Sequence, residues 1–229
     1  MRITLDSGTV AELARPPGRG SGLGLVLAPD IAGLRPLFDE LCEQLAERHG
    51  WVVCAPEPFP GRETLDVEGR RAALAGFDDG RVIGDLVDAA GRTGCHQTAV
   101  MGFCMGGMYA LKATASGAFS RAVAFYGMIR VPETWRGPGQ GEPLDALARA
   151  GDVPVLAVVG ERDPYTPPAD IDALAGLSNV AVARYPDAEH GFAHDPSRPA
   201  YRSGDAADAW RRALAFLAGQ PATSHQAGS

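Results

Sequence analysis

Cys104 lies midway between Gly102 and Gly106, in a position that could supply a nucleophile. The apolar run 97–101 before it has the length of a strand, and residues 109–113 after it favour a helix. A Gly-x-Cys-x-Gly turn between a strand and a helix is typical of the nucleophile elbow, where one side chain is held at the tip of a sharp turn. Glycine is needed on both sides because such a turn leaves no room for side chains there. The helix dipole at this position favours a thiolate, so we expect Cys104 to attack an acyl carbon.

Two other residues could complete a catalytic triad with this cysteine. Asp163 follows the apolar segment 153–159, and His190 lies in the loop between the last predicted strand and the last predicted helix. Where a triad includes a nucleophile elbow, its members run nucleophile, acid, histidine along the chain, and these residues keep that order. His190 would hold the proton or stabilise the thiolate and later activate water, while Asp163 would fix the imidazole tautomer. Each residue alone has a structural explanation: a buried cysteine, an Asp-Pro turn and a solvated loop histidine. Their shared order and placement favour catalysis.

Three more positions follow from the same chemistry. The oxyanion of an acyl-transfer intermediate is bound by the N–H of the residue after the nucleophile, here Met105. A second N–H comes from the loop after an earlier strand, and Ile31 is our candidate. Asp30, beside it, also lies at a predicted strand end, although it could instead cap the helix that begins near Pro36.

The elements that must position these residues indicate an α/β fold. Strands alternate with helices, and most strands are continuous apolar runs, which is typical of a mostly parallel sheet covered on both faces. Residues 3–5 and 10–14 look like an N-terminal hairpin, and 128–142, rich in Pro and Gly, like a loop or lid over a site. We expect one domain over residues 1–217 and a disordered tail over 218–229.

Composition excludes several classes of function. The formal net charge is −7 without a basic run, so neither nucleic acid nor an anionic membrane surface is an expected partner. The N-terminus lacks the apolar core of a signal peptide, and no apolar stretch has the length of a membrane span. The cysteines show neither disulfide spacing nor a CxxC pair; they are Cys42, Cys54, Cys95 and Cys104. We expect a cytoplasmic protein with reduced thiols, monomeric or a small homo-oligomer.

No cofactor or metal is expected. The glycine-rich turn at 16–22 precedes a strand instead of following one, so it does not match a dinucleotide-binding motif, and NAD and FAD are unsupported. His190 and His194 are four residues apart, but Gly191 and the Asp195–Pro196 pair indicate a loop, which lacks the helical geometry of a zinc motif.

Several segments together resemble the dienelactone hydrolase family over about residues 23–217. The resemblance is carried by residues 102–107, 160–163 and 189–192, and further by 29–33, 51–56 and 84–86. It implies an α/β-hydrolase fold and cofactor-free hydrolysis of esters or lactones through a Cys-His-Asp triad of Cys104, His190 and Asp163. Dienelactone is the substrate of the best-known members.

The chain departs from the family pattern at two positions. Dienelactone-cleaving members have a Glu, which helps to generate the thiolate, where this chain has Asp30. They also have an Arg that holds the substrate carboxylate where this chain has His194, a weaker and pH-dependent cation. A second family Arg could correspond to Arg70 or Arg71, although a solvated helix face explains either of these equally well. We therefore expect Asp30 to assist nucleophile activation, and His194, Arg70 or Arg71 to contact substrate. The bidentate clamp is weakened, which implies an ester or lactone substrate that need not be dienelactone.

Two other functions remain open at this point. The same triad could hydrolyse a thioester or transfer an acyl group, since both proceed through an acyl-thiol intermediate. A non-catalytic ligand-binding or redox-sensing protein could instead use an oxidisable Cys104. A binding protein has no need of Asp163 and His190 at these positions, so the hydrolase is favoured.

Overall fold

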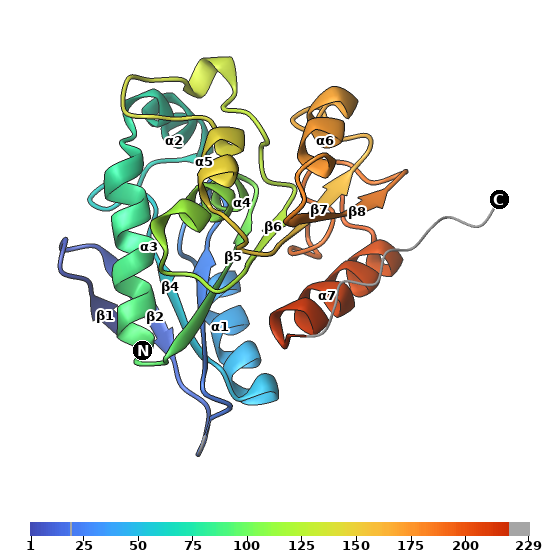
Figure 1. Ribbon diagram of the computed structural model, residues 1–229. Helices are drawn as coiled ribbons and strands as arrows, with labels where there is room; N and C mark the ends of the chain where they lie inside the picture. The colour runs from blue at the N-terminus through green and yellow to red at the C-terminus, as the bar shows by residue number, and fades with distance from the viewer. Residues whose placement is uncertain (19, 220–229) are drawn as a thin grey trace.

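An eight-stranded sheet runs through the molecule in the order β1-β2-β4-β3-β5-β6-β7-β8 (Figure 1). The structure is a computed structural model that describes residues 1–18 and 20–219. The strands are β1 (Arg2–Thr4), β2 (Val10–Ala14), β3 (Leu23–Ala28), β4 (Val52–Pro56), β5 (Gln97–Phe103), β6 (Ala122–Phe125), β7 (Val155–Gly160) and β8 (Val180–Tyr185). Only β2 runs antiparallel to its neighbours, so the predicted hairpin and the mostly parallel sheet are both confirmed.

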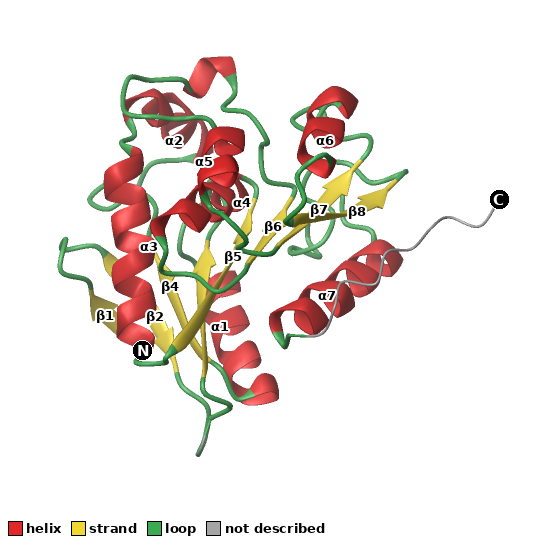
Figure 2. Ribbon diagram, viewed as in Figure 1, coloured by secondary structure: helices red, strands yellow, loops and turns green. Residues whose placement is uncertain are grey.

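Helices cover both faces of this sheet (Figure 2). The α-helices are α1 (Pro36–His49), α2 (Val67–Ala73), α3 (Asp79–Thr93), α4 (Met105–Ala113), α5 (Pro143–Arg149), α6 (Pro168–Ala175) and α7 (Ser203–Leu217). Helices α1 and α7 pack on one face, whereas α3 and α4 pack on the other with α5 against α4 (Figure 1). The central strands are buried on both faces, which explains why their sequences are continuous apolar runs.

Three of these helices were not expected from the sequence. Helices α2 and α5 have seven residues each and α6 has eight. A segment of about two turns is too short for an apolar period of 3.6 residues to repeat, so its helical pattern is weak. Pro143 and Pro168 begin two of them, in the position where proline is well tolerated.

The strand register brings the carboxyl ends of the parallel strands to one edge of the sheet. Ala28 of β3 pairs with Gly102 of β5, and Phe103 of β5 pairs with Phe125 of β6. On the other side of β6, β7 pairs with β8 up to Gly160 and Tyr185. Residues that directly follow β3, β5, β6 and β7 therefore lie along the same edge, where ligands bind in open α/β sheets.

The segment 128–142, expected to be a loop or lid, is tied to the body of the protein. Asp79, at the start of α3, donates its N–H to the carbonyl of Gly139 and accepts from the N–H of Gly141. The amide of Gln140 bonds the carbonyl of Leu74, and Trp135, in a short 3₁₀ turn, is buried. The segment is thus held in place by hydrogen bonds at its far end and a buried ring near its middle.

Two expectations concern the ends of the chain and its environment. The predicted tail, 218–229, lies outside the described residues from position 220 onward, and α7 ends at Leu217. Within residues 1–18 and 20–219, none of the helices combines the length and the apolar character that crossing a bilayer requires.

Candidate active site

Cys104 occupies a strained turn between β5 and α4. Its backbone angles are φ 57° and ψ −120°, which makes it one of two described residues other than glycine with positive φ. Such a conformation costs about 1–3 kcal/mol and persists only where the surroundings enforce it. Here the N–H of Cys104 donates to the carbonyl of Phe125 at 3.0 Å, and its carbonyl accepts from Met108 at 3.0 Å. The strain therefore places one side chain at the N-terminus of α4, with 7% of the residue exposed.

The glycines around the cysteine are required by the close approach of backbones. A Cβ on Gly102 would lie 2.1 Å from the carbonyl oxygen of Gly106, and a Cβ on Gly106 would lie 2.0 Å from the carbonyl oxygen of Ala28. Neither oxygen can move away without breaking a strand or a helix. The first turn of α4 is thereby pressed against the end of β3.

Replacing Gly106 with alanine is expected to prevent folding, because its Cβ would also lie 2.4 Å from the carbonyl oxygen of Pro29. The matched control is Gly91→Ala on the exposed face of α3, where the new methyl meets no atom within 4 Å. That variant should gain roughly 0.5–1 kcal/mol of stability. Soluble yield and urea unfolding measure both changes, and a Gly106→Ala protein as stable as wild type would contradict the packing described.

His190 and Asp163 are brought together from different strand ends. The Nδ1 atom of His190 lies 2.7 Å from Oδ2 of Asp163, whose side chain is fully buried. The other carboxylate oxygen of Asp163 accepts the N–H of Tyr165 at 2.8 Å. These bonds orient the carboxylate and leave Nε2 of His190 buried without a hydrogen-bond partner among the described residues. A buried ring nitrogen in that condition is unusual and is best explained by a reacting group that uses it.

The charges around His190 favour its protonated form. Burial alone lowers the pKa of His190, but the carboxylate of Asp163 and the sulfur of Cys104 outweigh it and raise the pKa to about 9. The rings of Tyr126 and Tyr165 stand edge-on to the imidazole, with centroids 5.3 Å and 4.9 Å away. The imidazolium is therefore stabilised in a site from which aromatic rings exclude much of the water.

The two expected oxyanion donors lie at the same point of the sheet edge. Met105 is the first residue of α4, where the N–H groups have no partner within the helix. Ile31 follows β3, and the contact of Gly106 with the end of β3 brings this loop against α4. Neither N–H donates a hydrogen bond to another described residue. Both residues therefore stay candidate oxyanion donors.

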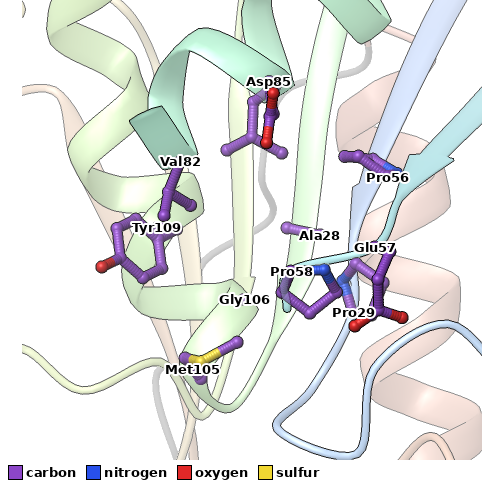
Figure 3. A pocket seen from close by; sticks show the side chains of 11 residues that line it. Ala28, Pro29, Pro56, Glu57, Pro58, Val82, Asp85, Met105, Gly106 and Tyr109 are labelled. Carbon is purple, nitrogen blue, oxygen red and sulfur yellow. The ribbon is translucent and has the colours of Figure 1, made fainter. Parts of the chain in front are cut away.

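A small cavity borders the first turn of α4, next to the elbow (Figure 3). It measures about 20 Å³ and is lined by Pro29, Met105 and Gly106 together with residues of β4, α3 and α4. Such a space holds roughly one water molecule. Cys104 does not line it, so it is a packing gap and not the space that would receive an acyl group.

Asp30 is engaged by cations and backbone groups instead of capping α1. Its carboxylate accepts from both terminal nitrogens of Arg35, at 2.6 Å and 3.0 Å, and from the N–H of Ala32 at 2.9 Å. Burial raises the pKa of Asp30, but its hydrogen bonds to His194 and Arg35 lower the pKa by a larger amount. The net result is a pKa well below the usual range of an aspartate. Asp30 is therefore ionised, and its hydrogen bonds run to Arg35, Ala32 and His194.

His194 lies inside the protein with both ring nitrogens in use. Its Nε2 lies 2.8 Å from Oδ2 of Asp30 and its Nδ1 lies 2.5 Å from the hydroxyl of Tyr126. The side chain has no exposed surface. The structure thus places His194 between Asp30 and Tyr126, a pairing that the sequence did not predict, and leaves no ring nitrogen free for a substrate carboxylate.

The two candidate arginines differ in their surroundings. Arg70 is buried, pairs with Glu57 at 3.0 Å and donates to the carbonyls of Leu65 and Glu63. Its guanidinium also covers the ring of Phe59. Arg71 is exposed on α2 and forms no ion pair with another described residue. The structure therefore gives Arg70 a role in holding the loop after β4, whereas the guanidinium of Arg71 has no ion-pair partner in the described part of the chain.

Three residues of this region were not identified from the sequence. Tyr126 has φ 39° directly after β6 and reaches His194, and Arg35 reaches Asp30. Glu57 accepts the N–H groups of Leu34 and Phe59 and so fixes the loop that carries Ile31. Glu57 and Tyr126 each follow an apolar strand, and that position is the signal that could have found them.

A metal centre has no support in the described part of the chain, since no three His, Cys, Asp or Glu side chains gather there in a suitable arrangement. The cysteines at 42, 54, 95 and 104 are all free thiols.

Comparison with known proteins identifies the family. The model of the dienelactone hydrolase family matches residues 10–220. A carboxymethylenebutenolidase of Rhodococcus opacus is 33% identical, covering 86% of this chain and 81% of its own. A Bradyrhizobium protein assigned as a 2-oxo-3-(5-oxofuran-2-ylidene)propanoate lactonase is 30% identical, covering 91% and 88%. A crystal structure from Klebsiella pneumoniae assigned as a dienelactone hydrolase has a TM-score of 0.84 at 25% identity, covering 95% and 97%. The chain therefore belongs to the dienelactone hydrolase family and is a lactone or ester hydrolase with the α/β-hydrolase fold.

Proposed function

We propose that the protein hydrolyses carboxylic esters or lactones through a triad of Cys104, His190 and Asp163 and a covalent acyl-cysteine intermediate. One observation carries the proposal. Nδ1 of His190 is held by Asp163 at 2.7 Å, while its Nε2 is buried, has no hydrogen-bond partner among residues 1–18 and 20–219, and lies within electrostatic reach of Cys104. This is the arrangement in which an imidazole can pass a proton between a thiol and a substrate.

Acylation requires a thiolate, an acid and an oxyanion site. The sulfur of Cys104 attacks the carbonyl carbon, and the negative oxygen that forms is bound by the N–H groups of Met105 and Ile31. The C–O bond then breaks, and the His190 imidazolium gives its Nε2 proton to the leaving alkoxide. With a lactone the alcohol formed stays attached to the acyl chain, because the ring has opened at that bond.

Deacylation reverses the roles at the same atoms. Neutral His190 takes a proton from water through Nε2, and the hydroxide attacks the thioester carbon. The C–S bond breaks, and Cys104 leaves as a thiolate beside the imidazolium, which restores the resting pair. The Nδ1 proton stays on His190 throughout, hydrogen-bonded to the carboxylate of Asp163, which stabilises the charged ring.

The acyl-cysteine can be trapped directly. The protein is mixed with p-nitrophenyl acetate, quenched in acid within the first turnovers and digested for mass spectrometry. We expect acetate on the peptide that contains Cys104 and on no peptide with Cys42, Cys54 or Cys95. Turnover without an acyl group on Cys104 would overturn the mechanism. Reaction of Cys104 with iodoacetamide, together with no turnover of any ester or lactone, would favour a specialised acyl donor or a redox role.

The substrate class follows from the charges in the site. The names of the two relatives specify lactones that bear a carboxylate, and so a cation to hold it would be expected in them. In this chain His194 is buried between Asp30 and Tyr126, and Arg70 is paired with Glu57. We infer that this protein acts at least as well on neutral acyl groups.

A matched pair of substrates tests this inference. p-Nitrophenyl butyrate and the p-nitrophenyl monoester of succinic acid differ in charge at the end of similar chains. We expect kcat/KM to be about tenfold higher for the neutral ester, because desolvating a carboxylate that finds no partner costs about 1–3 kcal/mol.

A preference for the charged ester would contradict the inference and direct attention to Arg71. In that case Arg71→Gln should remove the preference, while Arg48→Gln, an exposed arginine in the last turn of α1, should not.

A further inference from the structure

A second hydrogen-bonded chain lies beside the candidate triad. It runs from Asp30 through His194 to Tyr126, with distances of 2.8 Å and 2.5 Å. All three residues are buried, with exposed fractions of 3%, 7% and 0%. Asp30 follows β3, Tyr126 follows β6, and His194 lies in the loop between β8 and α7. The chain thus joins three segments that are far apart in the sequence.

The partners of these groups permit one arrangement of protons. Asp30 is ionised and can only accept, so Nε2 of His194 must carry the hydrogen. Burial lowers the pKa of His194 and the carboxylate of Asp30 raises it, but burial together with the charges of Arg198 and Arg35 outweighs Asp30, so the imidazole is neutral and its Nδ1 accepts. The hydrogen bond from Tyr126 must therefore be donated by the phenol, whose pKa burial raises well above its ordinary value. Every polar atom of the chain is satisfied without substrate.

Each end of this chain touches a component of the proposed catalytic site. The ring of Tyr126 stands edge-on to His190 at 5.3 Å between centroids, and to Phe192, in the same loop, at 5.6 Å. Asp30 directly precedes Ile31, one of the expected oxyanion donors. His194 is four residues beyond His190 on the loop that carries it. Through these side chains the loop is joined to the ends of β3 and β6.

We propose that Tyr126 and His194 are positioning residues for the reaction, and that the chain Asp30–His194–Tyr126 holds the His190 loop against the ends of β3 and β6, which flank the strand that carries Cys104. The inference rests on the hydrolase mechanism proposed above. In this proposal His194 acts by positioning His190 and does not contact the substrate. Because the rate of proton transfer depends steeply on geometry, a displacement of His190 by about 1 Å can cost about 100-fold.

The variant Tyr126→Phe tests the proposal, since it removes one hydroxyl and keeps the ring. We expect kcat for p-nitrophenyl acetate to fall about 10–100-fold with KM nearly unchanged. Alkylation of Cys104 by iodoacetamide at neutral pH should slow about tenfold, because the imidazolium is less well placed beside the thiolate. The alkylation needs no substrate, so it remains informative if the natural substrate is not an ester.

The control is Tyr185→Phe, which removes a hydroxyl that bonds Asp208 at 2.8 Å outside the chain. It should leave kcat and the alkylation rate unchanged. His194→Gln keeps a donor for Asp30 but cannot reach Tyr126, so we expect it to resemble Tyr126→Phe. Because both break the same link, the double variant should lose no more than His194→Gln alone.

Three results would overturn the proposal. If Tyr126→Phe kept the wild-type kcat and the wild-type rate of alkylation, the hydroxyl would serve only the stability of the fold, even if the melting temperature fell. A rise in KM at constant kcat would place Tyr126 in substrate binding instead. Additive losses in the double variant would show that the two residues act separately. A Cys104→Ala protein that still turns over ester would defeat the hydrolase mechanism, a failure distinguishable from these three.

Discussion

Replacing Cys104 with alanine is expected to abolish ester and lactone hydrolysis, with kcat lower by at least about 10⁴-fold. The substitution removes the sulfur that would form the acyl bond. Without it no acyl-enzyme can form, and alanine offers no group that could act as the nucleophile instead. Alanine keeps the Cβ and fits the same strained turn, so the protein should remain folded. Hydrolysis of p-nitrophenyl acetate at saturating substrate measures the effect, with circular dichroism to verify the fold.

The matched control is Cys95→Ala, at the opposite end of β5 from the elbow. Cys95 is partly exposed and donates hydrogen bonds to Thr93 at the end of α3, so its loss should leave kcat unchanged. Cys104→Ser provides a finer comparison, because a hydroxyl in the same place is a weaker nucleophile beside an imidazole paired with Asp163. Activity within tenfold of wild type in Cys104→Ala would show that the nucleophile lies elsewhere or is water.

Asp163→Asn should lower kcat by about 10³–10⁴-fold while the protein keeps its fold. The amide of asparagine can donate to Nδ1 of His190, which would put the ring in the wrong tautomer and leave a hydrogen on Nε2. Asp187→Asn is the control, since Asp187 forms an exposed ion pair with Arg162 near the same loop. Equal activity of Asp163→Asn and wild type would remove Asp163 from the triad.

The same variant should also change the pH dependence. The carboxylate of Asp163 helps raise the pKa of His190 to about 9, so the imidazolium that protonates the leaving group is lost near that pH in wild type. Without the carboxylate the pKa falls towards the ordinary imidazole value of about 6.5. The falling limb of kcat/KM against pH should therefore move to lower pH. A limb that stays near its wild-type position would show that Asp163 does not set it.

Stability should follow the same linkage. A pKa raised on folding means that protonation of His190 favours the folded state. This contribution is complete below about pH 6.5 and is lost as the pH rises through about 9. Asp163→Asn should therefore be destabilised relative to wild type most strongly just below about pH 6.5, and the difference should shrink as the pH rises through about 9 in thermal unfolding.

The amino-acid sequence determined the parts of this protein that depend on local pattern. Continuous apolar runs identified the parallel strands, because a strand buried on both faces has no polar side to show. Gly102 and Gly106 around Cys104 indicated the elbow, since that turn has a steric requirement within five residues. The order of Cys104, Asp163 and His190, each after a strand, indicated which acid would meet which histidine. The last two do meet, at 2.7 Å.

The tertiary structure decided what the remaining polar residues do. Asp30 and His194 are 164 positions apart, and only the sheet order and register bring the ends of β3 and β6 under the loop that follows β8. Arg70 resembled a free surface cation in sequence, because one arginine on a short helix gives no sign of a buried carboxylate at Glu57. Such pairings depend on which side chains face each other across strand ends. A local pattern records how often an apolar residue recurs along the chain, but it carries no information on the partner that folding places opposite a charge.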